Sequence, residues 1–442
     1  MIEYGQQEQD RVILVGLDTG EEKEFEHSME ELKSLAEACN KKVVGIITQR
    51  APEIHKAFYI GVGKVEEVKE FARTREATEV VFDNALSPSQ IRNLVKELDL
   101  AVSDRTNLIL DIFATRAQTR EAKLQVETAR LKYMLPRLVG MRESLGRQGG
   151  ASGSMSNKGV GEKKLELDRR KIEHRISELE KELSNIASNR MTQRKRRDAS
   201  NIPQVALVGY TNAGKSTLLN HMVDLFCKRE EKKVLEKDML FATLETNVRY
   251  IETGNHKPFY LADTVGFINK LPHSLVKAFH STLEEVLYAD LLLHVVDFSD
   301  ENYKQHMAVT ADTLRELGAG DIPQIVVYNK ADLCGVTDFP VVKEGASFAS
   351  GHSDARNPVI YLSARDEQSV RGLVRLIQQI IYAKNIDCTL RIPYDRGDIV
   401  DYFNRYATVE GREYREDGIV MQVNCREQDA SKFEMYLLRD DT

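Results

Sequence analysis

The chain has 442 residues, too many for one domain, and 42% of them are hydrophobic, so it can build several buried cores. No apolar run approaches the roughly 18 residues that a membrane-spanning helix needs, and the first ten residues are polar. We therefore expect a cytoplasmic protein without a signal peptide or membrane span. The five cysteines are scattered and form no CxxC pair, which argues against a disulfide framework or a cysteine-bound metal.

The net charge of -7 conceals an uneven distribution along the chain. Residues 116–200 hold 21 Lys and Arg against 11 Asp and Glu, so the remainder of the chain is strongly acidic. A basic segment inside an acidic protein indicates a local contact with a polyanion.

Residues 1–112 alternate between apolar runs and amphipathic stretches, which predicts a small α/β domain. We predict strands at 11–17, 43–48 and 79–83, and helices at 28–40, 65–74 and after the capping residue Ser87. Residues 61–64 (GVGK) lack both the spacing and the following Ser or Thr of a phosphate-binding loop. We expect a turn there, with a weak basic contact as the alternative.

Residues 113–200 differ from the first domain and are rich in Leu, Ala, Lys, Arg and Glu. Leucines recur on one stripe within 121–143, and apolar residues follow a seven-residue pattern within 162–189. The Gly-rich stretch 145–161 separates them, so we predict two long antiparallel helices joined by a flexible tip loop. The plain interpretation is a coiled-coil spacer. The alternative is an arm whose basic tip, with Arg147 and Lys158, meets RNA phosphates.

The rest of the chain is organised around residues 205–217. An apolar run predicts a buried parallel strand, and the Gly-x4-Gly-Lys-Ser spacing that follows is typical of a phosphate-binding loop. Its glycines let the backbone approach a phosphate, and its amides face anionic oxygens at the start of a helix. Lys215 can reach the β- and γ-phosphates, and the Ser216 hydroxyl can bind Mg²⁺. The loop comprises Gly209, Tyr210, Thr211, Asn212, Ala213, Gly214, Lys215, Ser216 and Thr217.

Three later stretches indicate which nucleotide is bound. After an apolar run, DTVG at 263–266 offers a carboxylate near Mg²⁺ and a glycine amide near the γ-phosphate. A strand at 324–328 ends in NKAD, where Asp332 can accept two hydrogen bonds from guanine, whereas adenine lacks the matching donors. A third strand ends at 363–365, where a backbone amide can contact the guanine carbonyl. The residues concerned are Asp263, Thr264, Val265, Gly266, Asn329, Lys330, Asp332, Ser363, Ala364 and Arg365.

These stretches, in this order, resemble the GTPase superfamily. The resemblance implies a doubly wound, mostly parallel sheet over residues 201–385. A helix at 370–381 should close that sheet. Beyond it, alternating stretches at 416–425 and 433–438 predict strands of a small α+β domain, residues 386–442, which carries no catalytic pattern and which we interpret as a docking or stabilising unit.

Stretches along nearly the whole chain resemble the HflX family of bacterial GTPases. They are GVGKVEEV at 61–68, DNALSPSQIRNL at 83–94, residues 104–138, GVGEKKLELDRR at 159–170, and FATLE and DTVGFINKLPH beginning at 241 and 263. The resemblance implies binding to the large ribosomal subunit, with the tip reaching 23S rRNA near the peptidyl transferase centre. It also implies splitting of stalled or idle 70S ribosomes under stress.

The same resemblance implies a switch segment beside the nucleotide, with Thr243 as a further Mg²⁺ ligand. This segment comprises Phe241, Ala242, Thr243, Leu244 and Glu245. It continues as Thr246-Asn247, where the family usually reads FATLDPT. The tip sequence also differs from the family pattern. It reads GGASGSMSNKGVGEKKLE where the family usually has GGxGxRGPGETQLE, so Val160 replaces the proline. This tip is similar to HflX paralogues linked to resistance against ribosome-targeting antibiotics, which makes resistance a further hypothesis.

The residue after DTVG bears on the rate of hydrolysis. Many GTPases keep a glutamine there to orient the attacking water, and Phe267 cannot do so. We expect slow intrinsic hydrolysis that the large ribosomal subunit stimulates. The alternative is that Phe267 is a core residue and another residue positions the water.

We therefore predict a monomeric GTP hydrolase in four parts, with GTP and Mg²⁺ as cofactors. The parts are an N-terminal α/β domain (1–112), a helical arm (113–200), a P-loop GTPase domain (201–385) and a C-terminal α+β domain (386–442). Lys215, Thr243 and Gly266 are the expected catalytic residues, and Ser216, Thr243 and Asp263 the expected Mg²⁺ ligands. The alternatives are an ATP-using P-loop enzyme such as a kinase, a GTP-binding coiled-coil scaffold, and an RNA-binding ribosome assembly factor without splitting activity.

Overall fold

The chain divides into two compact units, which are described separately. The first comprises residues 1–188, 239–244 and 269–280, and the second comprises the remainder. The computed structural model describes residues 9–20, 25–147, 155–198, 202–227, 241, 247–254, 257–272, 275, 280–336, 341–344 and 357–438.

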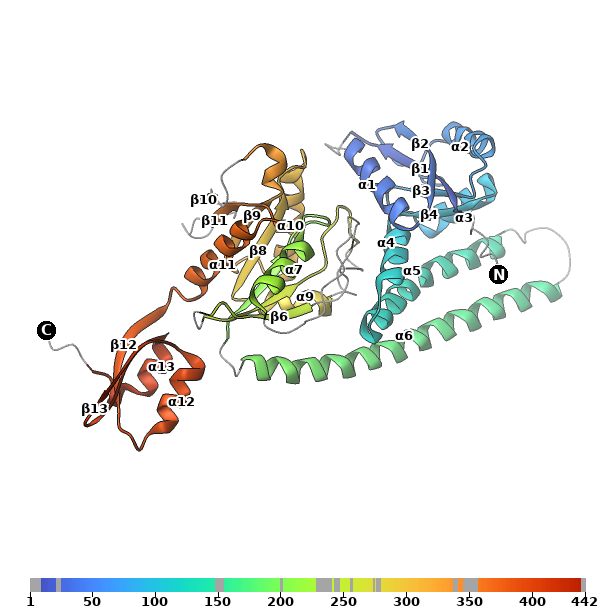
Figure 1. Cartoon of the computed structure of the whole chain (residues 1–442). Helices are drawn as coiled ribbons and strands as arrows, with labels where there is room; N and C mark the ends of the chain where they lie inside the picture. Colours follow the sequence, from blue (N-terminus) through green and yellow to red (C-terminus); the bar gives the residue numbers. More distant parts are fainter. Residues whose placement is uncertain are drawn as a thin grey trace, which may run out of the picture. The chain divides into compact units, whose positions relative to one another are not determined.

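The first unit begins with a four-stranded parallel sheet in the order β2-β1-β3-β4 (Figure 1). Its elements are β1 (Arg11–Asp18), α1 (Phe25–Ala38), β2 (Lys42–Arg50), α2 (Val62–Thr74), β3 (Glu79–Phe82), α3 (Pro88–Leu98), β4 (Ala101–Asp104) and α4 (Arg105–Arg116). The apolar side chains of β1 and β3 are buried against α2 and α3, which confirms the predicted α/β fold. Ser87 caps α3 with a reciprocal bond to Gln90, as predicted.

The prediction of a turn at residues 61–64 is wrong. The helix α2 starts at Val62, and Gly61 is its N-terminal cap, with an amide that donates to Gln49 Oε1 at 2.8 Å. Lys64 lies in the first helical turn and pairs with Glu67 at 2.7 Å. Gln49 of β2 thus bonds to the amide of the N-cap residue, a contact that the local sequence does not indicate.

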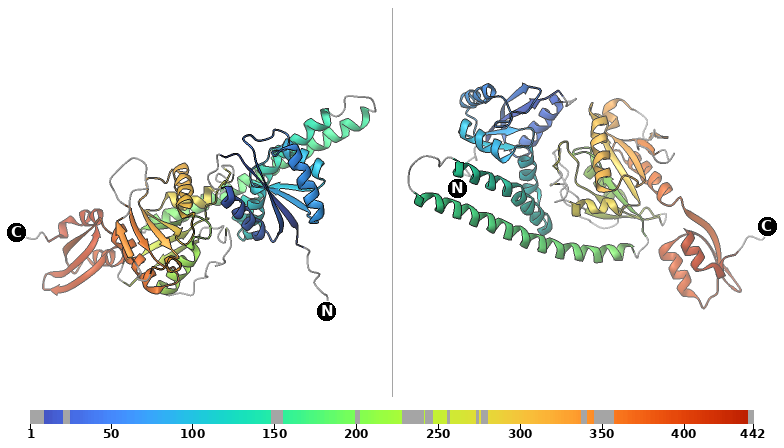
Figure 2. Two further views of the ribbon diagram at one scale, coloured as in Figure 1. Left: turned by 90° about the horizontal axis from the view of Figure 1, so that it is seen from above. Right: turned by 180° about the vertical axis from the view of Figure 1, so that it is seen from behind.

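Two long helices, α5 (Arg120–Arg147) and α6 (Met155–Asp198), follow and lie side by side in both views of Figure 2. Arg120 pairs with Glu182 at 2.7 Å and Arg175 with Glu127 at 2.9 Å, so residue numbers rise along one helix as they fall along the other. This confirms the antiparallel pair. The helix α6 starts before the predicted residue 162, so only the middle of the expected 145–161 loop, residues 148–154, lies outside the described helices.

One buried carboxylate fastens the arm to the α/β domain. Asp104, fully buried at the end of β4, accepts hydrogen bonds from the Tyr133 hydroxyl at 2.5 Å and from Arg137 at 3.1 Å, both on α5. It also accepts from the amides of Leu86 and Asn107. A carboxylate with this many donors holds the helix in one orientation because losing any of them leaves buried charge uncompensated.

The second unit contains a seven-stranded sheet in the order β10-β11-β9-β8-β5-β7-β6, in which only β6 and β10 run antiparallel to their neighbours. This confirms the predicted P-loop GTPase sheet. The strands are β5 (Gln204–Val208), β6 (Asn247–Ile251), β7 (Phe259–Asp263), β8 (Leu291–Asp297), β9 (Gln324–Asn329), β10 (Val341–Glu344) and β11 (Pro358–Tyr361). The helices are α7 (Lys215–Phe226), α9 (His280–Leu287), α10 (Tyr303–Leu317), η1 (Ala331–Cys334) and α11 (Glu367–Ile381).

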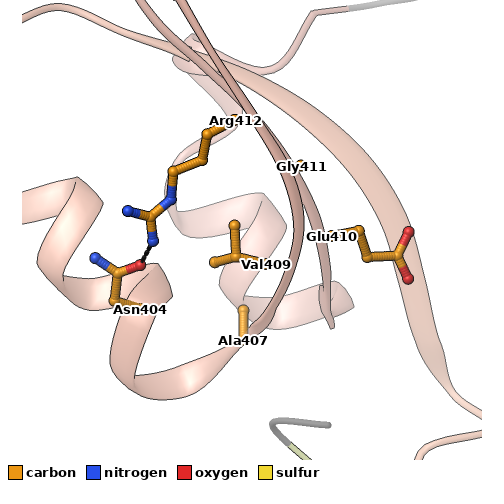
Figure 3. A pocket seen from close by; sticks show the side chains of 6 residues that line it. All are labelled: Asn404, Ala407, Val409, Glu410, Gly411 and Arg412. Carbon is orange, nitrogen blue, oxygen red and sulfur yellow. Dashed lines mark hydrogen bonds between the residues drawn. The ribbon is translucent and has the colours of Figure 1, made fainter.

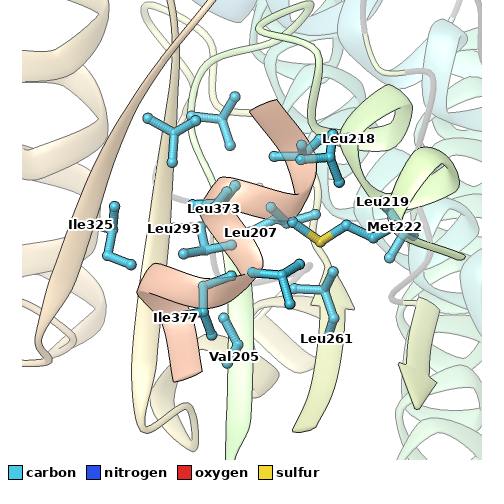
Figure 4. Close-up of a cluster of buried hydrophobic side chains, with 14 of the residues drawn as sticks. Val205, Leu207, Leu218, Leu219, Met222, Leu261, Leu293, Ile325, Leu373 and Ile377 are labelled. Atoms are coloured by element: carbon cyan, nitrogen blue, oxygen red, sulfur yellow. The ribbon is translucent and has the colours of Figure 1, made fainter. Parts of the chain in front are cut away.

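One face of this sheet packs against α7 and α11 (Figure 4). Leu207 and Leu293 from the strands meet Leu219 and Met222 of α7 and Leu373 of α11, all fully buried. The core therefore lies directly beneath the carboxyl end of β5, where the phosphate-binding loop begins.

The chain continues into a small antiparallel sheet in the order β12-β14-β13. Its elements are β12 (Asn385–Ile392), α12 (Gly397–Tyr406), β13 (Thr408–Arg415), β14 (Gly418–Arg426), α13 (Glu427–Lys432) and η2 (Glu434–Tyr436). The predicted strand at 433–438 is wrong: these residues form a short 3-10 turn, and only Leu437 bridges to β12. A shallow pocket of about 290 Å³ lies between α12 and β13, where Arg412 reaches Asn404 (Figure 3).

Candidate functional site: a phosphate-binding loop and its surroundings

The loop between β5 and α7 needs glycine at both ends. Gly209 has a φ of 145°, and a Cβ there would lie 2.1 Å from the Val295 carbonyl oxygen. Gly214 caps α7 with a φ of 93°, and its Cβ would lie 2.2 Å from Asn329 Nδ2. Both conformations and both close approaches exclude any larger residue. The loop thus has the backbone shape that the Gly-x4-Gly spacing predicts.

Lys215, the first residue of α7, lies within the loop and is almost completely buried. Its ammonium donates to the carbonyl oxygens of Gly209 at 3.0 Å and Tyr210 at 2.7 Å. Burial lowers the pKa of this ammonium to about 8, although the charge of Asp263 acts in the opposite direction. The loop therefore holds a cation with little water around it, where attraction to a phosphate is strong.

Ser216 and Asp263 present oxygen ligands side by side at the end of the sheet. The Ser216 hydroxyl donates to Asp263 Oδ2 at 3.0 Å, and Asp263 is fully buried at the end of β7. A hydroxyl and a carboxylate are ligands that Mg²⁺ accepts, together with phosphate oxygens and water, so this pair fits that ion. The neighbouring Thr264 instead donates to the Leu207 carbonyl at 2.6 Å and braces the strand pair. Ala242, Thr243, Leu244 and Glu245 lie outside the described residues.

The segment after Asp263 rests directly on the loop. A Cβ on Gly266 would lie 2.9 Å from Thr211 Cα and 3.0 Å from Lys215 Nζ, so the backbone approaches more closely than another residue allows. The Phe267 amide donates to the Gly209 carbonyl at 3.1 Å, and its carbonyl accepts from the Thr211 amide at 2.8 Å. The Phe267 side chain is only 2% exposed. Phe267 is therefore a core residue, as the alternative interpretation of this position proposed.

The predicted guanine-binding residues come together around Asn329. Its side-chain amide donates to the Ala213 carbonyl at 2.9 Å and accepts from the Ala364 amide at 2.8 Å. Asn329 thus joins the phosphate-binding loop to the 363–365 loop, a bracing role that the sequence did not indicate. Lys330 pairs with Asp297 at 2.6 Å, and Asp332 lies exposed on η1. Ser363 is buried, and Arg365 is exposed.

Three histidines border the site without any sequence pattern that could have found them. The His306 ring stacks on Tyr210 of the loop, with centroids 3.9 Å apart and planes within 11°. His221 Nδ1 lies 2.8 Å from the Ala364 carbonyl. Burial, with a further contribution from Lys215, lowers the pKa of His294 to about 4, so this side chain stays neutral at pH 7. His306 thus contacts the phosphate-binding loop, and His221 contacts the 363–365 loop.

Nucleotide binding should take up protons above pH 8. The free Lys215 ammonium has a pKa of about 8, and bound phosphates raise it because they stabilise the charged form. Titration calorimetry with GDP at pH 8.5, in buffers of different ionisation enthalpy, should show uptake of a fraction of a proton that falls towards zero at pH 7. Lys215→Met should lose both binding and uptake. Proton-neutral binding by the wild type at pH 8.5 would contradict this account.

Comparisons with known proteins agree with this geometry. Three family models match: "GTP-binding GTPase N-terminal" over residues 26–114, "GTP-binding GTPase Middle Region" over 116–197 and "50S ribosome-binding GTPase" over 204–330. None of the helices in the described ranges has the length and hydrophobicity that crossing a bilayer requires.

Relatives called GTPase HflX match over most of their length. The one from Lacrimispora saccharolytica is 42% identical over 93% of this chain and 92% of its own. Those from Alkalihalophilus pseudofirmus and Escherichia coli are 44% and 36% identical, over 87% and 93% of this chain and 88% and 92% of theirs. A solved GTP-binding protein from Sulfolobus solfataricus in complex with GDP is 26% identical, covers 84% of this chain and 98% of its own, and has a TM-score of 0.41. The chain therefore belongs to the HflX family of GTPases.

Proposed function

We propose that this GTPase binds the large ribosomal subunit in the cytoplasm, as a monomer, and uses GTP and Mg²⁺ to control that contact. The observation that carries the proposal is the combination, in one chain, of a formed phosphate-binding loop with a long helical arm that ends in a basic, Gly-rich sequence. The match to a ribosome-binding GTPase model over residues 204–330 supports it.

The residues of the site have separate tasks in this proposal. Lys215 neutralises the phosphate charge that develops during hydrolysis, and the Gly266 amide contacts the γ-phosphate. Ser216 and Asp263, with Thr243 as a third residue, hold Mg²⁺, which offsets charge on the β- and γ-phosphates. Asp332 selects guanine. Ser363, Ala364 and Arg365 border the base on its other edge.

Hydrolysis by the free protein is slow in this proposal because Phe267 offers no polar atom to the attacking water. Its ring is buried, and its backbone amide and carbonyl bond to the loop. The large subunit supplies or completes the group that orients the water, and hydrolysis then releases the protein. In this sequence of events the arm reaches 23S rRNA near the peptidyl transferase centre, and the protein splits stalled or idle 70S ribosomes under stress.

Replacing Asp332 should change the base that is recognised. The carboxylate accepts two hydrogen bonds from guanine, whereas an asparagine amide donates one and suits the second carbonyl of xanthine. Asp332→Asn should lower GTP affinity by roughly 10- to 100-fold and raise xanthosine triphosphate affinity. Competition against a fluorescent nucleotide measures both, with Asp312→Asn on α10 as the control. GTP binding equal to that of the wild type would rule out this role.

Reversing the charge of the tip should weaken the ribosome contact. Glutamate at Arg147 and Lys158 places negative charge against RNA phosphate and should reduce co-sedimentation with large subunits by about tenfold or more at low salt. Lys181→Glu, an exposed change on α6, the helix that also carries Lys158, should have little effect. Equal binding by the tip variant and the control would show that the tip does not contact RNA.

The divergent tip sequence also motivates a proposal of antibiotic resistance. Deleting the gene should lower the minimum inhibitory concentration of ribosome-targeting antibiotics, and complementation should restore it. An unchanged minimum inhibitory concentration for every such drug class would contradict resistance, without affecting ribosome binding itself.

A further inference from the structure

Two short segments that flank the nucleotide site in sequence belong to the first compact unit. Phe241 lies just before Thr243, and residues 269–272 lie just after Gly266, yet both group with the N-terminal α/β domain. In GTPases these are the two regions that respond to the γ-phosphate. What holds them therefore bears on which nucleotide the protein prefers.

Residues of the α/β domain contact both Phe241 and the segment 269–272. The Lys270 ammonium donates to Asp83 Oδ2 at 2.5 Å, and the Asn269 carbonyl accepts from Arg105 Nη1 at 3.5 Å. The ring of Phe241 meets that of Phe113 edge to face, with centroids 4.7 Å apart. Phe241 is 2% exposed, so it is packed into this contact. Residues 269 and 270 are thus held by one hydrogen bond and one ion pair, and Phe241 is held by one aromatic contact.

Asp83, the partner of Lys270, is itself held by buried charged groups. Asp83 is fully buried and also pairs with Arg105 at 2.5 Å, while Arg105 pairs with Glu31 at 2.6 Å and donates to the Ser28 carbonyl at 2.7 Å. Burial raises the pKa of the Asp83 carboxyl, but Arg105 and Lys270 outweigh that effect and hold the pKa below its usual range. The carboxylate is therefore charged at neutral pH. Lys270 is the more accessible member, with its side chain 22% exposed.

Lys270 follows Gly266 by only four residues, so its ion pair with Asp83 also restrains the segment that lies against the phosphate-binding loop. Lys270 adopts a left-handed φ of 56°, a conformation that persists where the surroundings hold it. Ile268 is buried, Phe267 bonds to Gly209 and Thr211, and Gly266 approaches Lys215. A γ-phosphate makes a contact in this region that a diphosphate lacks, and the ion pair of Lys270 with Asp83 restrains the backbone there.

We propose that Lys270 and Asp83 are positioning residues that set the preference between GDP and GTP. Their ion pair stabilises residues 266–270 in the arrangement seen here and so weakens GTP binding relative to GDP binding. A partner that loosens the pair shifts the protein towards GTP. This goes beyond ribosome binding, and its test uses the full-length protein without ribosomes, so failure of either proposal leaves the other standing.

The decisive variant is Lys270→Met, which removes the charge but leaves Asp83 paired with Arg105. The affinities for fluorescent GDP and for a fluorescent non-hydrolysable GTP analogue should be measured under the same conditions. The preference for the GTP analogue over GDP should rise by about fivefold or more, the scale of typical coupling between sites. Lys270→Arg should keep the wild-type ratio because it restores the ion pair.

Lys41→Met is the matched control. Lys41 forms an equally enclosed ion pair with Glu79 in the same domain, with side chains 12% and 11% exposed. It should cost comparable stability without changing the GTP to GDP ratio. Phe241→Ala, which frees the other segment, should raise the ratio in the same direction as Lys270→Met. A ratio that stays at the wild-type value in both folded variants, or that moves equally in Lys41→Met, would overturn the proposal.

Discussion

The buried ammonium of Lys215 is the constraint around which the nucleotide site is built. A cation with so little water around it must be compensated by oxygen atoms, and the carbonyls of Gly209 and Tyr210 provide them. The loop can curl around the ammonium only because glycine occupies positions 209 and 214, and the next segment can approach only because residue 266 is glycine. The close approach of Gly266 to the Lys215 ammonium thus accounts for one of the three glycines, whereas Gly209 and Gly214 lie against Val295 and Asn329.

Two consecutive residues in the α/β domain link structures that lie far apart in sequence. Asp104 holds the arm through Tyr133 and Arg137, and Arg105 pairs with Asp83, which holds Lys270. The junction of β4 and α4 is therefore shared by the helix that leads towards the tip and by the segment that follows Gly266. Asp104 and Arg105 are thus neighbours in sequence that hold two different segments.

Much of the fold was predictable because its signals are local. Apolar runs predict strands, and β1, β2, β3, β5, β9 and β11 lie where such runs were found, whereas β4, β6, β8 and β10 were not predicted. The loop residues 209–217 were predictable because few sequences satisfy the backbone demands of phosphate binding. The start of α2 was predicted wrongly because the Gly61 amide bonds to Gln49, which lies on β2. The final strand was predicted wrongly because short amphipathic stretches also fit a turn.

The contacts that join distant segments could not be predicted from one sequence. Lys270 and Asp83 are 187 residues apart, and no sequence pattern near either residue predicts their contact. The bracing role of Asn329 was hidden for the same reason, since its partners lie in loops after β5 and β11. His306 has no motif, and only the sheet order places α10 beside the loop. Such pairings depend on topology, which local periodicity does not specify.

Control of GTP turnover by the large ribosomal subunit is the part of the proposed function on which the rest depends. The most direct test is GTP hydrolysis by the purified protein, alone and with purified large subunits, at fixed Mg²⁺ and salt. The account predicts slow turnover alone and at least about tenfold stimulation by the subunits, in keeping with a partner that completes the site. Tight GTP binding with unchanged turnover at saturating subunits would contradict it.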